Sequence, residues 1–231
     1  MQEENLQLSS RTKDSYDTCY KTRNYFGYRE WIYRPYLKAL LARANLRAGS
    51  ALLDVGCGQG FFSNLLRKCG MRVTGIDMSE TGIRMAKECY GSSDIEFLVA
   101  DVNTISTTEP FDCVFTRSLS LYNTLDFATR REVTEALMKY VRPNGTFIFA
   151  YNTNLNAAKA NSDWRYHTLQ DAQRHFSSYK GVKCFFTLKI ETLIFGKYAF
   201  NSLFSRAGAA VSSALGVGGE LVCIVRKEYG E

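Results

Sequence analysis

Short apolar runs alternate, between residues 51 and 150, with segments in which apolar residues recur every three or four positions. A short apolar run predicts a strand buried on both faces, and the longer spacing predicts an amphipathic helix. Strands that alternate with helices indicate a parallel sheet covered by helices. The expected strands are Ala51–Val55, Arg72–Ile76, Ile95–Ala100, Phe111–Thr116 and Thr146–Ala150.

Helices are predicted on either side of these strands. Phe61–Cys69 follows the first strand, and Thr129–Val141 precedes the fifth. A further helix is predicted over Tyr28–Arg47, which has one continuous apolar face. Pro35 lies inside this range and suits the first position of a helix, so we expect the helix proper to begin near Arg34.

The pattern changes after the fifth strand. Thr168 suits the N-cap of a helix that runs to about Ser177. Val182–Phe195 is rich in β-forming side chains, Ser202–Leu215 is predicted to be helical, and Leu221–Val225 is a further apolar strand.

A glycine-rich turn directly follows the first strand. From Asp54 the sequence reads D-x-G-x-G-x-G, with glycines at 56, 58 and 60. Glycine permits a sharp turn and lets the backbone approach a ligand at the N-terminus of the next helix. The dinucleotide fingerprint G-x-G-x-x-G needs a glycine where this chain has Phe61, so a dehydrogenase is disfavoured.

Acidic residues follow the second and third predicted strands. Asp77 lies about 20 residues past the turn, where a carboxylate accepts hydrogen bonds from ribose hydroxyls. Asp101 follows the third strand. A single aspartate at a strand end is more often a cap or turn residue, so the interpretation depends on the ordered combination of turn and acids.

The glycine turn, Asp77-Met78 and Asp101-Val102 together resemble the motifs of class I S-adenosylmethionine-dependent methyltransferases. The resemblance covers about residues 48 to 228, with specific motifs only in the first half. It implies an α/β fold: a seven-stranded, mostly parallel Rossmann-like sheet with helices on both faces and an antiparallel last strand between strands five and six. It also implies an N-terminal tail and helical cap (1–47) over a methyltransferase domain (48–231).

The implied cofactor is S-adenosylmethionine, with S-adenosylhomocysteine as the product. The glycines would shape the turn beside its methionine part, and Asp77 would hold the ribose. Asp101 and Val102 would bind the adenine, against which Met78 would pack. The resemblance implies these cofactor-binding residues: Asp54, Gly56, Cys57, Gly58, Gly60, Asp77, Met78, Asp101, Val102, Arg117 and Ser118.

The residues after the fourth strand narrow the chemical class of the methyl acceptor. Thr116 to Tyr122 contain neither the Asn/Asp-Pro-Pro-aromatic motif for amide or exocyclic nitrogens nor the clustered acids of metal-dependent catechol enzymes. Cys113 lies mid-strand, where it cannot be the nucleophile of a base-C5 enzyme. The resemblance therefore favours transfer to an N or O atom, or a C atom, of a small molecule without a metal.

The basic charge is concentrated near the N-terminus. Residues 11 to 47 hold nine Lys or Arg and three acids, which matches the net charge of +6, and they are rich in tyrosine. Such a segment indicates nucleic acid or an anionic substrate, although a solvated helix face is commoner. In the resembled small-molecule enzymes, N-terminal helices form part of the substrate site, so Tyr20, Tyr25 and Arg34 are candidates; packing on the sheet would explain the aromatics equally well.

Histidine is the usual base for O-methylation. His167 follows the fifth strand at the mouth of the expected cleft, whereas His175 is expected on a helix surface or in the core. A polar loop residue without a catalytic role is the commoner explanation of His167. The expected catalytic residues are His167, Tyr20 and Tyr25, and the expected substrate-binding residues are Arg34, Tyr122 and Tyr151.

Length and composition suit one globular protein, at 231 residues and 45% hydrophobic. No apolar run reaches the roughly 20 residues of a membrane span, and the polar N-terminus lacks a secretory signal. The seven cysteines are odd in number and contain no C-x-x-C pair, so we expect no disulfide or metal framework and a cytoplasmic location.

Three functions remain open at this point. The first is a small-molecule methyltransferase that is a monomer or a homodimer, with nucleic acid and membrane disfavoured as partners. The second is an RNA methyltransferase that uses the basic aromatic N-terminus as a platform. The third is a non-catalytic protein that binds S-adenosylmethionine.

Overall fold

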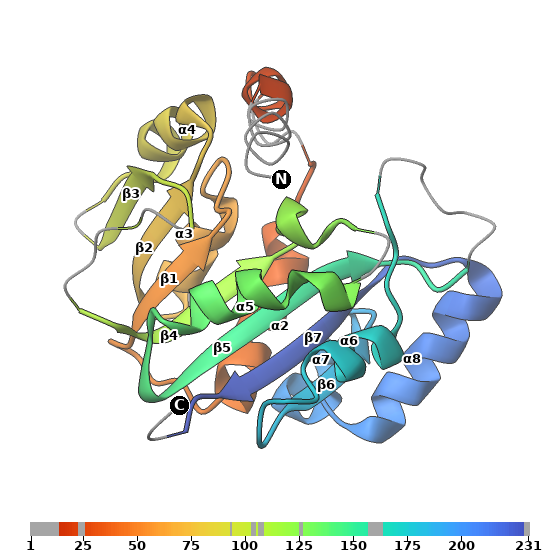
Figure 1. The fold of residues 1–231 in the computed structure, drawn as a ribbon. Helices are drawn as coiled ribbons and strands as arrows, with labels where there is room; N and C mark the ends of the chain where they lie inside the picture. The colour runs from red at the N-terminus through yellow and green to blue at the C-terminus, as the bar shows by residue number, and fades with distance from the viewer. Residues whose placement is uncertain are drawn as a thin grey trace.

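The computed structural model describes residues 14–22, 26–92, 94–102, 105, 109–124, 127–156 and 164–228. Seven strands form one sheet in the order β3-β2-β1-β4-β5-β7-β6 (Figure 1). β1 to β5 run parallel, and β7 lies antiparallel between β5 and β6. This topology confirms the expected Rossmann-like sheet. The strands are β1 (Ala51–Val55), β2 (Arg72–Asp77), β3 (Ile95–Val99), β4 (Phe111–Arg117), β5 (Val141–Thr153), β6 (Lys183–Thr187) and β7 (Gly219–Arg226).

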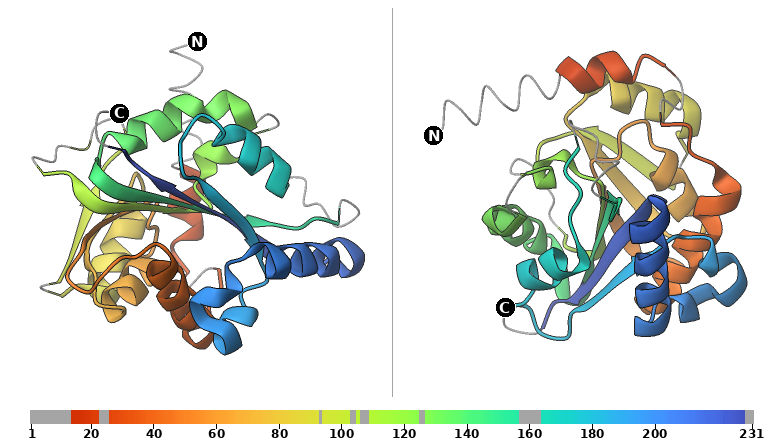
Figure 2. Two further views of the ribbon diagram at one scale, coloured as in Figure 1. Left: turned by 90° about the horizontal axis from the view of Figure 1, so that it is seen from below. Right: turned by 90° about the vertical axis from the view of Figure 1, so that its right-hand side faces the viewer.

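Helices cover both faces of the sheet (Figure 2). Neighbouring residues of a strand point to opposite faces, so Leu52 packs into one apolar cluster and Leu53 into the other. The first cluster includes residues of α2, α3 and α4, and the second includes residues of α5 and α6. The helices are α2 (Glu30–Arg43), α3 (Phe61–Lys68), α4 (Glu80–Tyr90), α5 (Arg131–Met138), α6 (Leu169–His175), α7 (Glu191–Phe195) and α8 (Ser202–Leu215), with 3-10 turns at Ser120–Tyr122, Phe127–Arg130 and Gly196–Ala199.

Two helices differ from the expectation. α2 begins at Glu30, so Pro35 lies inside the helix rather than at its first position. A proline there leaves the carbonyl of Trp31 without its usual donor, and water can replace that donor because Trp31 is exposed. The β-forming run Val182–Phe195 is a strand only in its first part, β6. Lys189 adopts a left-handed φ of 72°, which turns the chain out of the sheet, and α7 follows.

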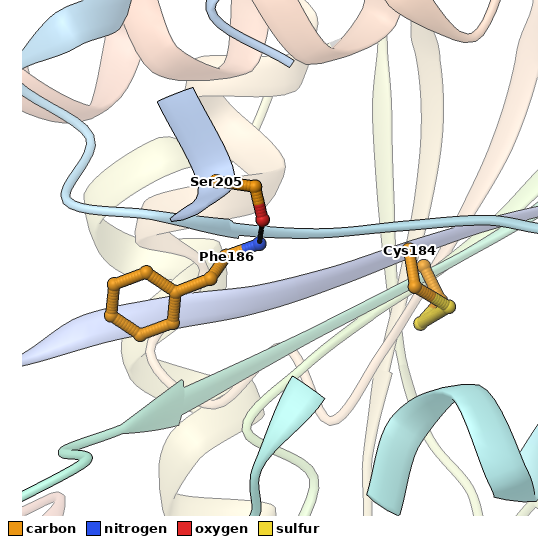
Figure 3. The surroundings of a disulfide bond; sticks show 4 residues. Cys184, Phe186 and Ser205 are labelled. Atoms are coloured by element: carbon orange, nitrogen blue, oxygen red, sulfur yellow. Dashed lines mark hydrogen bonds between the residues drawn. A yellow bond between two sulfur atoms is a disulfide. The ribbon is translucent and has the colours of Figure 1, made fainter. Parts of the chain in front are cut away.

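Cysteine pairing also corrects the expectation. Cys184 of β6 and Cys223 of β7 form a disulfide, with Cα atoms 4.2 Å apart (Figure 3). The two residues are direct partners in the antiparallel register, a long-range relationship that sequence spacing does not reveal. The cytoplasmic location stays a prediction, and the cysteine pattern no longer supports it. Within the described residues, every helix is too short or too polar to cross a bilayer.

Candidate active site

The glycine turn connects β1 to α3 in a left-handed backbone conformation. The φ angles are 75° at Gly56, 52° at Gly58 and 76° at Gly60. The backbone N–H groups of Gly56 and Cys57 both donate to the carbonyl of Ile76, each over 2.9 Å, which fixes the turn against the end of β2. A side chain at Gly60 would come within 2.8 Å of Ala86, so this glycine permits helix packing.

Asp77, the last residue of β2, lies beside this turn. One carboxylate oxygen accepts from the Gly58 N–H over 2.8 Å, and the other accepts from the Ser79 N–H over 2.9 Å. Burial raises the pKa of Asp77, and these two hydrogen bonds oppose the rise. A carboxylate has about four acceptor positions, so Asp77 retains acceptor capacity for a ligand.

Asp54 is a second buried carboxylate at the turn. Its Oδ2 accepts from the hydroxyl of Ser63 over 2.6 Å. Burial raises the pKa of Asp54 to about 7, with the nearby charge of Asp77 acting in the same direction. Close to neutral pH, a positive group beside Asp54 would therefore favour its ionised form.

A cavity of about 1430 Å³ lies at the carboxyl ends of the parallel strands. In an open α/β sheet this edge is where ligands bind. Its lining includes every expected cofactor-binding residue except Gly60. Asp101 and Val102 line it after β3, Asp77 and Met78 at the end of β2, and the glycine turn after β1.

Residues 14–22, here called the N-terminal segment, attach to the glycine turn and to α4. Asp17 accepts hydrogen bonds from the backbone N–H of Thr81, over 3.1 Å, and from the hydroxyl of Ser79. Tyr20 is buried with its ring against Gly58, and the side-chain amide of Gln59 donates to its carbonyl over 3.0 Å. The helix of this segment, red in Figure 1, lies beside α4.

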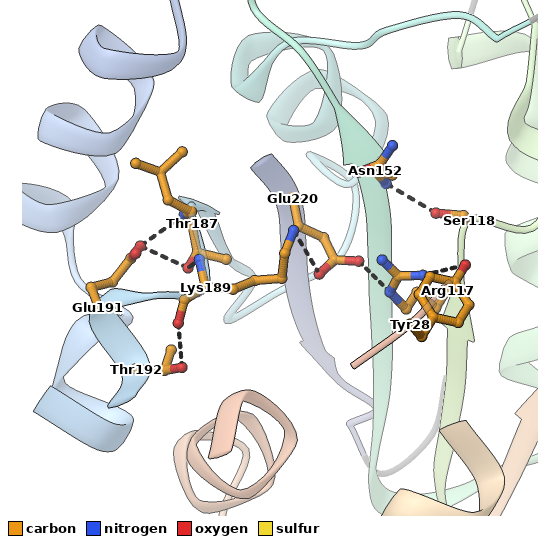
Figure 4. Close-up of polar contacts among 10 residues, drawn as sticks. Tyr28, Arg117, Ser118, Asn152, Thr187, Lys189, Glu191, Thr192 and Glu220 are labelled. Atoms are coloured by element: carbon orange, nitrogen blue, oxygen red, sulfur yellow. Dashed lines mark hydrogen bonds and ion pairs between the residues drawn. The ribbon is translucent and has the colours of Figure 1, made fainter. Parts of the chain in front are cut away.

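A buried charged cluster joins the end of β4 to β7, across β5, and its member Arg117 lines the cavity. Arg117, the last residue of β4, lies 2.6 Å from Glu220 of β7 and donates to the Tyr28 hydroxyl over 3.0 Å (Figure 4). Lys189 lies 3.9 Å from the other oxygen of Glu220. Sequence reasoning missed Glu220 and Lys189, because neither belongs to a local motif and both come from the last two strands and their connection.

The expected catalytic residues do not all lie at the cavity. Tyr20 lines it, and Tyr25 lies outside the described residues. His167 was expected at the cleft mouth, but its ring is buried, stacks on Phe127 at 4.7 Å, and contacts the carbonyl of Tyr122 over 2.9 Å. It is not among the residues that line the cavity. That placement corrects its expected position and gives no support to a role as base.

The three expected substrate-binding residues also lie away from the cavity lining. Arg34 is exposed and pairs with Glu30 on the outer side of α2. Tyr122 is fully buried, and its hydroxyl lies 2.8 Å from that of Thr134. Tyr151 is also buried and donates to the carbonyl of Arg165. Their neighbours Leu121, Asn123 and Asn152 line the cavity instead.

Comparison with known proteins agrees with this geometry. The methyltransferase domain family matches residues 46–208. The chain belongs to the class I S-adenosylmethionine-dependent methyltransferases. S-adenosylmethionine is the cofactor of this family, and the residues of the cavity fit it. Asp77 retains acceptor capacity for the ribose hydroxyls, and Asp101, Val102 and Met78 lie on the side where the adenine would bind.

Two curated relatives share parts of this methyltransferase. Nodulation protein S of Sinorhizobium fredii is 32% identical over 46% of the chain and 50% of the relative. The malonyl-[acyl-carrier protein] O-methyltransferase of Serratia marcescens is 24% identical over 74% of the chain and 60% of the relative. The chain thus spans half to three fifths of the length of these relatives.

A solved structure matches nearly the whole methyltransferase chain. It is the N-methyltransferase NodS from Bradyrhizobium japonicum in complex with S-adenosyl-L-homocysteine, with a TM-score of 0.64 and 17% identity. The match covers 94% of this chain and 99% of that chain. At this identity the likeness shows a shared fold.

Proposed function

We propose that this chain transfers a methyl group from S-adenosylmethionine to an N or O atom of a small-molecule metabolite. The observation that carries the proposal is the convergence of the glycine turn, Asp77 and Asp101 on one large cavity. The cofactor supplies an electrophilic methyl group. The protein then has to align an acceptor in line with it and exclude water.

A small acceptor is supported by the walls of the cavity. The N-terminal segment contributes Tyr16 and Tyr20, and the cavity is also lined by Tyr28, which precedes α2, and Tyr33, which lies in α2. Small-molecule sites commonly measure about 300–1,000 Å³, so a cavity of about 1430 Å³ suits a cofactor together with a compact acceptor. Tyrosine suits such a wall because its ring packs and its hydroxyl forms hydrogen bonds.

The proposal names two alternatives for the acceptor atom, nitrogen and oxygen. One relative is named as an O-methyltransferase that acts on malonyl-[acyl-carrier protein], and the matching structure is titled an N-methyltransferase. Relatives of both kinds therefore leave nitrogen and oxygen as alternatives for this chain.

The positions of the tyrosines do not favour an RNA platform. Bases stack on aromatic rings that are open to solvent. Tyr16, Tyr20, Tyr28 and Tyr33 instead line the cavity, and Tyr20 is buried. Among the described residues of this region, the exposed large aromatic side chains are Phe26 and Trp31, so the four tyrosines give no support to a stacking platform.

Calorimetric titration of the purified protein with S-adenosylhomocysteine, with NAD in parallel, tests the cofactor. We expect micromolar binding of S-adenosylhomocysteine and no binding of NAD. Incubation with methyl-labelled S-adenosylmethionine and a metabolite extract, with tRNA as a separate sample, then tests the acceptor. Absence of S-adenosylhomocysteine binding would refute the proposal, and label in tRNA alone would replace the metabolite with RNA.

A further inference from the structure

Arg117 has more N–H donors than the acceptors around it among the described residues take up. Its side chain is 5% exposed and lines the cavity. Nε lies against one oxygen of Glu220, and one terminal nitrogen, Nη1, donates to Tyr28. A guanidinium carries five N–H donors. With the nearby Tyr33 hydroxyl as a further acceptor, these contacts use three of the five donors, so part of the fork is available to a ligand.

Aromatic rings restrict where that ligand can bind. The guanidinium carbon lies 4.4 Å from the ring centre of Phe62, 5.0 Å from that of Tyr28 and 5.1 Å from that of Tyr33. Rings in cation–π contact cover the faces of the guanidinium and hold it in place. An acceptor can therefore approach Arg117 only at the edge that carries its terminal nitrogens.

Glu220 does not pair with the terminal nitrogens of Arg117, because it lies between two cations, the Nε of Arg117 and the ammonium group of Lys189. Lys189 approaches its second oxygen, and Lys189 itself is held in a left-handed conformation in which its N–H donates to Thr187 over 2.9 Å. Glu191, the other acid near Lys189, accepts hydrogen bonds from Thr187 and Leu188. Arg117 and Glu220 therefore do not form the fork-to-fork pairing that arginine forms with carboxylates.

The sheet order places Arg117 on the acceptor side of the cavity. In the strand order from β3 to β5, the lining passes from Asp101 and Asp77 to the glycine turn after β1, and then to Arg117 at the end of β4 and Asn152 of β5. If the cofactor binds as proposed, its adenosine lies toward β2 and β3. The β4–β5 end of the cavity is then the most distant from it.

We propose that Arg117 anchors an anionic group, a carboxylate or a phosphate, of the methyl acceptor at the β4–β5 end of the cavity. This inference rests on the proposed methyltransferase function and narrows its substrate class to an anionic metabolite. Glu220 and Lys189 act as positioning residues, because they fix the guanidinium without lining the cavity themselves.

The test uses the full chain saturated with S-adenosylhomocysteine, and inorganic phosphate and acetate as separate probes at matched ionic strength. We expect at least one probe to bind, and Arg117→Gln to weaken that binding by about tenfold or more, since charge-assisted forks are strong. Arg84→Gln is the control, because Arg84 is an exposed arginine that pairs with Glu88. Unchanged binding in Arg117→Gln, or no binding by the wild type, would overturn the inference.

Arg117→Gln leaves Glu220 buried without its partner and can impair folding. The double variant Arg117→Gln/Glu220→Gln removes both charges and keeps the test valid; we expect it to lose anion binding as well. For the positioning role, Lys189→Arg should retain anion binding and Lys189→Met should weaken it at unchanged affinity for S-adenosylhomocysteine. Equal anion affinities in both Lys189 variants would contradict that role.

The resemblance implied that Arg117 binds the cofactor, which has a carboxylate of its own, so the affinity for the cofactor must be measured separately. We expect Arg117→Gln to change the affinity for S-adenosylhomocysteine by less than about threefold, well under 1 kcal/mol. A large loss of that affinity, with unchanged affinity for 5′-methylthioadenosine, which lacks the amino acid part, would assign Arg117 to the cofactor and overturn the inference. Failure of the wild type to bind S-adenosylhomocysteine would refute the proposed function instead.

Discussion

The backbone N–H of Gly58 donates to the carboxylate of Asp77 over 2.8 Å. This bond joins the glycine turn after β1 to the last residue of β2. It places the acid that would hold a ribose directly beside the turn that would receive the methionine part of the cofactor. The two sequence motifs are therefore one structural unit, and a change in either residue should affect cofactor binding.

Asp77→Asn should weaken binding of S-adenosylhomocysteine by about tenfold or more. In the wild type both carboxylate oxygens accept from backbone N–H groups, and in the variant an amide NH₂, which can only donate, would face one of those N–H groups. Calorimetry of the variant measures the effect. Asp112→Asn is the matched control: Asp112 also accepts a backbone hydrogen bond, from Ala51 over 2.7 Å, but does not line the cavity. Equal losses of affinity in both variants would indicate general destabilisation.

Gly58→Ala should reduce both stability and cofactor affinity. A Cβ at Gly58 would lie 2.7 Å from the hydroxyl of Tyr20, and the φ of 52° adds strain of about 1–2 kcal/mol for a residue with a side chain. Gly181→Ala separates backbone strain from the contact with Tyr20, because Gly181 has a φ of 63° but nothing lies within 4 Å of its added Cβ. Thermal melting and calorimetry should show the larger loss for Gly58→Ala. Equal losses would mean that contact with Tyr20 is unimportant.

The parallel strands were predictable from sequence because each contains a short segment rich in apolar residues between turn signals. β1 has the expected bounds, Ala51–Val55, and the apolar segment Ser202–Leu215 forms α8 as expected. Residues 191–195 form α7 although their side chains favour a strand. The left-handed turn at Lys189 determines the structure of this segment, and side-chain propensities do not predict such a turn.

The motif-based part of the site was predictable, and the acceptor side was not. Motif residues follow strand ends in a fixed order, so topology alone brings them together. Tyr151 was expected to bind substrate, but neighbouring residues of a strand point to opposite faces, and Asn152 lines the cavity instead. Glu220 reaches Arg117 only through the antiparallel pairing of β5 with β7, which no local pattern encodes.

His167→Ala should destabilise the fold by about 1–3 kcal/mol, because it removes a buried ring and its contact with the Tyr122 carbonyl. We expect the affinity for S-adenosylhomocysteine and the turnover per folded molecule to stay unchanged. Urea unfolding and the labelled-methyl assay, corrected for the folded fraction, measure these quantities. Reduced turnover at unchanged stability would restore His167 as a candidate base despite its placement.

Asp54→Asn should stabilise the protein more at high pH than at low pH. The folded-state pKa of Asp54 is raised to about 7, above the ordinary value of 3.8, so the folded state binds the proton more tightly than the unfolded state. This group therefore lowers the stability of the wild type as pH rises from about 4 to about 7, and the cost remains above that range. Asparagine has no such cost and still accepts from Ser63. Urea unfolding of both proteins at about pH 5 and pH 8 tests this, and an equal difference in unfolding free energy at the two pH values would contradict the raised pKa.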